Sequence, residues 1–141
     1  MEIIKLHAAV VHFGIAIPFG LLFMEIFYRV SKRQIDGLYI GFSLLASISV
    51  ILSTLSGIIS YEPIEDKLYQ IPIFETHKIL GLFTAGVFAL LGLLAVLKKH
   101  SFLSAVLVFG CILLLIQGWL GGSVVYDHMV KPWIKAPINP S

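Results

Sequence analysis

The residues of this chain that could do chemistry are its five histidines, and four of them are placed together by the sequence pattern. His7 and His12 lie at the start of the first long apolar stretch, His77 precedes the third and His128 follows the fourth. Imidazole is the commonest metal ligand in proteins, and imidazole alone suits copper, zinc or haem iron. Ionisable residues at the mouths of such apolar stretches indicate a functional site.

Composition places the chain among integral membrane proteins. Of its 141 residues, 58% are hydrophobic and only 13% are charged, whereas a soluble domain is about 25% charged. The net charge of +2 is too small to favour a nucleic-acid partner. Cys111 is the single cysteine, so the chain has no intrachain disulfide and no Cys-x-x-Cys-His motif for covalent haem attachment.

Four stretches free of Asp, Glu, Lys and Arg are long enough to cross a bilayer as helices, which takes about 20 residues. They are Leu6–Met24, Gly37–Tyr61, Ile79–Leu97 and Ser101–Tyr126. We expect helices at about 6–28, 37–60, 76–97 and 101–127, within a single membrane domain over 1–141. The links Val30–Asp36 and Lys98–His100 are short, so neighbouring helices must be antiparallel. The predicted fold class is all-α, as an integral membrane four-helix up-down bundle. The longer connection, Glu62–Glu75, has room for a short surface helix.

Basic residues predict the orientation of the chain in the membrane. One set falls on the side of the two short links: Arg29, Lys32, Arg33, Lys98 and Lys99. An equal number falls on the opposite side: Lys5, Lys67, Lys78, Lys131 and Lys135. Because the first set is concentrated in two very short loops, we place it in the cytoplasm and expect both termini outside.

In the antiparallel bundle the four histidines His7, His12, His77 and His128 map to one end, and His100 maps to the other. We expect His100 to be a solvated loop residue. His7 and His12 are separated by about 7.5 Å along a helix axis and about 140° around it. They cannot both bind one small ion unless the helix begins after His7; otherwise they serve separate sites, or one binds while the other hydrogen-bonds.

Glycines on the histidine-bearing faces favour a large flat ligand. Gly81 shares a face with His77, and Gly118 and Gly121 share one with His128. The same glycines fit tight helix packing equally well, because Gly118-x-x-x-Gly122 is a small-xxx-small pattern. Few carboxylates lie in the spans, which disfavours calcium or magnesium. We therefore predict a haem b, one or two per chain, bound by these histidines and glycines, or otherwise a histidine-bound transition metal.

Other polar residues in the apolar stretches are expected to be satisfied within the protein. Glu25 lies four residues before Arg29 and should pair with it. Gln117 should hydrogen-bond across the bundle. The serines and Thr54 of the second stretch can donate to carbonyls of their own helix.

Three segments resemble a known family: His7-x-x-x-x-His12-Phe13, His77 opening the third helix, and Gly118-Trp119-Leu120-Gly121-Gly122 leading to His128. The chain resembles a family of small bacterial predicted membrane proteins catalogued as a domain of unknown function. Ala8 and Gly14 stand where that family usually has proline, which relaxes the start of the first helix. Some members look fused to cytochrome c-like modules. The resemblance thus implies a redox function at the outer face of a bacterial cytoplasmic (inner) membrane.

The function predicted is that of a membrane b-type cytochrome-like electron-transfer protein, with histidine-ligated haem near the outer face. Its partners would be the lipid bilayer and a quinone or redox partner protein, with homo-oligomerisation left open. No nucleophile–base constellation is visible, so we expect an electron carrier or oxidoreductase subunit rather than a stand-alone enzyme. The alternative is a cofactor-free or metal-ion-binding membrane protein that acts in transport or complex assembly.

Overall fold

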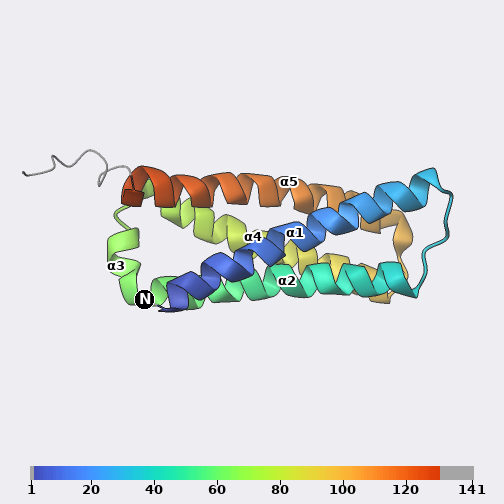
Figure 1. Cartoon of the computed structure of the whole chain (residues 1–141), viewed down its shortest axis with the longest axis horizontal. Coiled ribbons are helices and arrows are strands. Elements are labelled where there is room, and N and C mark those ends of the chain that lie inside the picture. Colours follow the sequence, from blue (N-terminus) through green and yellow to red (C-terminus); the bar gives the residue numbers. More distant parts are fainter. Residues whose placement is uncertain (1, 131–141) are drawn as a thin grey trace, which may run out of the picture.

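The computed structural model describes residues 2–130 and consists of four long antiparallel helices (Figure 1). These helices are α1 (Glu2–Val30), α2 (Gly37–Tyr61), α4 (Pro72–Val96) and α5 (His100–Val125). The remaining elements are short: the 3-10 turn η1 (Glu62–Ile64), the one-turn helix α3 (Glu65–Leu68) and the π-helical turn η2 (Tyr126–Val130). The predicted all-α up-down bundle is confirmed, as is the short helix in the middle connection.

The chain is a multi-pass membrane protein. Each long helix contains a span whose mean hydropathy is between 2.0 and 2.5, long and apolar enough to cross a bilayer. The outer surface of the bundle carries large apolar side chains, such as Phe23 (74% exposed) and Leu115 (62% exposed). Lipid acyl chains are the natural surroundings of such a surface.

Two helices begin earlier than the apolar stretches predict. The helix α1 starts at Glu2 rather than near residue 6, so His7 lies within it, and the alternative in which the helix begins after His7 does not apply. The helix α4 starts at Pro72 rather than near residue 76. Proline is favoured in the first helical turn because its fixed φ suits a helix and its missing N–H is not needed there.

The four helices form a closed ring in which α1 packs mainly on α2, α2 on α4, and α4 on α5, with α1 and α5 in lighter contact. Small residues permit this packing. A Cβ built on Gly110 would lie 2.8 Å from the Phe88 ring, and one built on Gly92 would lie 2.9 Å from Ser47 Oγ. Ser47 in turn donates to the carbonyl of Ser43 in its own helix, as predicted for this stretch. Close backbone approach through small residues is the usual basis of helix association in membranes.

The two ends of the bundle differ in character. The histidine end holds the first turns of α1 and α4 and the last turns of α2 and α5 (left in Figure 1). The basic end holds the tight links after Val30 and Leu97, in each of which one lysine, Lys32 or Lys98, has a positive φ. Lys131 and Lys135, which entered the prediction of orientation, lie outside the described residues.

Asp36 closes the first link at the basic end by capping α2. Its carboxylate accepts the backbone N–H of Tyr39 at 3.1 Å, the Tyr28 hydroxyl at 2.9 Å and Arg33 Nη2 at 2.8 Å. The Tyr39 N–H is the main cause that lowers the pKa of Asp36 below its usual value, followed by the Tyr28 hydroxyl. This cap satisfies one of the free N–H groups that every helix start leaves.

Candidate functional site

His7 is held inside the bundle by a side chain of the next helix. It is half-buried, and its Nδ1 atom lies 2.9 Å from Ser56 Oγ in α2. The Ser56 hydroxyl donates its proton to the carbonyl of Ser53 at 2.8 Å. Ser56 Oγ must therefore accept from His7, which places the imidazole proton on Nδ1. The Nε2 atom of a neutral His7 then carries a free lone pair.

His77 has a similar environment in the second hairpin. The side-chain amide of Gln117 in α5 donates to the backbone carbonyl of His77 at 2.9 Å, as the expected bond across the bundle. The same amide nitrogen lies 3.5 Å from His77 Nε2. Since an amide nitrogen only donates, Nε2 of His77 is the ring acceptor and Nδ1 carries the proton.

Two buried polar atoms beside His77 have no hydrogen-bond partner within the described part of the chain. They are His77 Nδ1 and Gln117 Oε1. Buried polar atoms are nearly always paired in proteins, and exceptions concentrate at functional sites. Each of the two atoms therefore requires a partner, such as a bound water molecule or a ligand.

His7 and His77 both lie near the starts of their helices, at the histidine end of the bundle. The two residues belong to different hairpins, α1–α2 and α4–α5. Each imidazole also packs against a glycine of the other helix in its own hairpin. A Cβ built on Gly57 would lie 3.1 Å from His7 Cε1, and one built on Gly121 would lie 3.0 Å from His77 Cε1. The same local arrangement thus occurs twice at the histidine end.

The predicted glycines have close neighbours in this structure. The face of Gly121 is covered by the His77 ring, and a Cβ built on Gly81 would lie 2.9 Å from Gln117 Nε2. Gly118 is more open, with Ile15 Cδ1 at 4.0 Å from such a Cβ. The sequence pattern predicts space for a flat ligand beside Gly81 and Gly121. In the structure, the side chains of Gln117 and His77 occupy that space.

The other predicted ligands, His12 and His128, point away from the interior. His12 is exposed, and its Nδ1 atom contacts the carbonyl of Ala8 one turn earlier in α1. His128 is exposed in the π-helical turn η2. Among residues 2–130, no three His, Cys, Asp or Glu side chains converge in a way that could hold a metal ion. The structure thus places two of the four predicted histidines, His7 and His77, partly in the interior and leaves His12 and His128 exposed.

His100 differs from its predicted state. It is the first residue of α5 at the basic end and is half-buried, with a buried Nδ1 atom that has no hydrogen-bond partner in the described structure. It lines a hollow together with basic residues of the first link, including Lys32 and Arg33. The expectation of a solvated loop residue is therefore wrong, because the helix begins at His100 itself.

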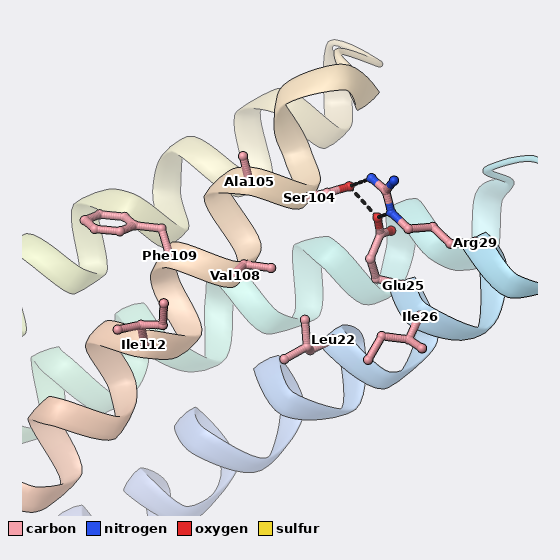
Figure 2. A pocket seen from close by; sticks show the side chains of 9 residues that line it. All are labelled: Leu22, Glu25, Ile26, Arg29, Ser104, Ala105, Val108, Phe109 and Ile112. Atoms are coloured by element: carbon pink, nitrogen blue, oxygen red, sulfur yellow. Dashed lines mark hydrogen bonds and ion pairs between the residues drawn. The ribbon is translucent and has the colours of Figure 1, made fainter.

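The basic end also contains a charged cluster around the buried Glu25 side chain, which we call the Glu25 cluster: Glu25, Arg29, Tyr39 and Ser104. Glu25, whose side chain is only 7% exposed, pairs with Arg29 Nε at 2.6 Å as predicted. Its carboxylate also accepts the hydroxyls of Tyr39, at 2.6 Å, and of Ser104. Arg29 Nη2 donates to Ser104 Oγ at 2.6 Å and joins α1 to α5 (Figure 2). Sequence spacing indicated only the Glu25–Arg29 pair, because Tyr39 and Ser104 belong to other helices.

No protein-family model matches the chain, and no curated protein and no solved structure is similar to it. The resemblance to the family of small bacterial membrane proteins stays a prediction. The case for a function rests on the residues described above.

Proposed function

We propose that this protein is a membrane-embedded electron-transfer protein in which His7 and His77 would hold a b-type haem at the histidine end. The observation that carries the proposal is the presence of two partly buried imidazoles from different hairpins at one end of the bundle, each with Nε2 as the unprotonated ring nitrogen. The Nε2 atom of His77 accepts from the Gln117 amide, so Gln117 has to turn away before this nitrogen can bind iron. Neutral imidazole with a free lone pair is the form that binds a metal.

The number of ligands favours haem over a bare ion. Haem iron already has four equatorial nitrogens and takes two axial ligands from the protein. A zinc or copper ion held by protein alone takes three or four ligands, and residues 2–130 offer no such group. When bound, haem would supply a one-electron redox couple in apolar surroundings.

The neighbours of the two histidines have defined roles in this proposal. Ser56 accepts the Nδ1 proton of His7, which orients the ring and keeps Nε2 free. Such an outer partner is a regular feature of metal-binding histidines. Gln117 holds the backbone of His77, while Gly57 and Gly121 allow each ring to approach the neighbouring helix.

One observation favours the alternative, a membrane protein of transport or complex assembly that works without a bound cofactor. The space beside Gly81 and Gly121 is filled by Gln117 and by His77 itself. A macrocycle on those faces requires both side chains to move. The two proposals therefore differ in a directly measurable property, the presence of haem.

The test is the visible spectrum of protein purified in mild detergent from haem-replete cells. We expect a Soret band, α and β bands on reduction, and about one haem per chain by pyridine haemochrome assay, the stoichiometry that a two-ligand site requires. His7→Ala and His77→Ala should lose the haem, whereas His12→Ala, His128→Ala and His100→Ala should keep it. These expectations follow burial, because His7 and His77 are half-buried whereas His12 and His128 are exposed.

A colourless protein without metal by elemental analysis overturns the haem proposal and supports the alternative. Haem that survives both His7→Ala and His77→Ala but is lost in His12→Ala or His128→Ala assigns the ligands to the exposed pair. Matched expression and elution volume in all five variants exclude loss through misfolding.

The proposed outer location of the site depends on orientation. Arg29, Lys32, Arg33, Lys98 and Lys99 all lie at the basic end, so this end should face the cytoplasm. A reporter fused after Ser141 should then be active only on the outer side. Activity on the cytoplasmic side would place the histidine end, and electron exchange with soluble partners, inside the cell.

A further inference from the structure

A second candidate site lies at the basic end, at the opposite end of the bundle from His7 and His77. An open hollow of about 560 Å³ runs along the junction of α1 and α5 (Figure 2). Its walls are apolar: Leu22, Ile26, Ala105, Val108, Phe109 and Ile112. Its volume is within the usual range for a small-molecule site, about 300–1,000 Å³. An acyl chain is the kind of group such a membrane-exposed wall accommodates.

The Glu25 cluster closes one end of this hollow. Glu25, Arg29 and Ser104 line it, and the Glu25 carboxylate is already satisfied by Arg29, Tyr39 and Ser104. Arg29 balances the charge of Glu25 through their ion pair. The Glu25 carboxylate therefore needs no cationic ligand. The cluster lies between the apolar hollow and a charged region at the basic end.

The charged region is a second hollow of about 280 Å³ that shares Glu25, Arg29 and Ser104 with the first. Its further lining includes Lys32, Arg33 and His100. Three cationic side chains, Arg29, Lys32 and Arg33, thus face two carboxylates: Glu25, and the Asp36 carboxylate that pairs with Arg33. This leaves an excess of one positive charge. His100 adds a buried Nδ1 atom that has no hydrogen-bond partner within the described part of the chain.

We propose that the two hollows together bind one anionic phospholipid. Its phosphate would lie among Arg29, Lys32 and Arg33, and one acyl chain would follow the α1–α5 hollow. Basic pockets between membrane helices are suited to anionic headgroups, whereas a zwitterionic lipid or an uncharged quinone head does not match this excess charge. The site is independent of any haem at the histidine end.

Native mass spectrometry of the full chain in detergent tests the proposal, with phosphatidylglycerol and phosphatidylcholine of identical acyl chains as probes. We expect phosphatidylglycerol to bind at one site about tenfold more tightly than phosphatidylcholine. The variant K32Q/R33Q should lower that affinity about tenfold. The control K98Q/K99Q removes two charges of the neighbouring link, which do not line either hollow, and should change it less than twofold.

A second pair of variants tests the acyl-chain position. Ala105→Trp fills the apolar hollow and should lower binding of phosphatidylglycerol, whereas Ala89→Trp, an exposed position of α4, should not. Equal affinity for both lipids, equal losses in the two charge variants, or tighter binding of an uncharged quinone analogue would each overturn the proposal. Because the charge variants leave the apolar wall intact, a folding defect in Ala105→Trp does not affect the conclusion.

Discussion

His7 in α1 and Ser56 in α2, 49 positions apart in the chain, are joined by a 2.9 Å hydrogen bond between Nδ1 and Oγ. The bond fixes which imidazole nitrogen carries the proton, because Ser56 uses its own proton on the carbonyl of Ser53. Ser56 thus leaves the Nε2 atom of His7 unprotonated, which is the form that can bind a metal.

Ser56→Ala should therefore weaken the proposed haem site without abolishing it. Loss of an outer partner typically lowers metal affinity about 10–100-fold. The measurement is haem affinity by titration of apoprotein. Thr54→Val is the matched control, since Thr54 donates to Val50 of its own helix. Independently of haem, the ¹⁵N shifts of His7 should report the Nδ1–H tautomer in the wild type; an Nε2–H tautomer would contradict the assignment.

Gly121→Ala should destabilise the protein more than Gly122→Ala does. A Cβ at Gly121 would lie 3.0 Å from His77 Cε1, whereas nothing lies within 4 Å of one at Gly122. The two changes have the same intrinsic effect on a helix, so their difference isolates the contact with His77. We expect that difference to be about 1–2 kcal/mol. Equal unfolding midpoints in detergent for the two variants would show that the His77 ring moves aside freely.

Arg29→Met should be more harmful than the double change Glu25→Gln with Arg29→Met. The single variant leaves the buried Glu25 carboxylate without its cationic partner, while Tyr39 and Ser104 still donate to it. Losing a hydrogen bond to a charged group costs about 1.5–3 kcal/mol. Removing both charges leaves none unpaired, so stability should partly recover. Additive losses across this double-mutant cycle would contradict a coupled pair.

Asp36 predicts a specific dependence of stability on pH. Its pKa is lowered in the folded state, mainly by the Tyr39 N–H, so its contribution to stability is present above its ordinary value near 3.8. That contribution is lost as the pH falls through the lowered pKa of the folded state. Asp36→Asn should therefore lower the unfolding midpoint at pH 6 and have a progressively smaller effect towards pH 3. A difference that stays constant with pH would contradict the role of the charged cap.

Much of the fold follows from the chain alone. A stretch such as Gly37–Tyr61, without a single charge, has to form a membrane helix, because lipid offers no partner to an unpaired backbone. The short links force neighbouring helices to be antiparallel, and this places His7 and His77 at one end and His100 at the other. The pairing of Glu25 with Arg29 also follows from sequence, since four residues make one helical turn.

Which histidines face the interior was decided only by tertiary structure. In a soluble helix an apolar stripe marks the inner face, but a membrane helix is apolar on all sides because lipid and core are alike. The sequence therefore does not distinguish the interior position of His7 from the exposed position of His12, five residues later. The contacts of His7 with Ser56, of His77 with Gln117 and of Glu25 with Ser104 all join different helices, and only the packing of the bundle brings them together.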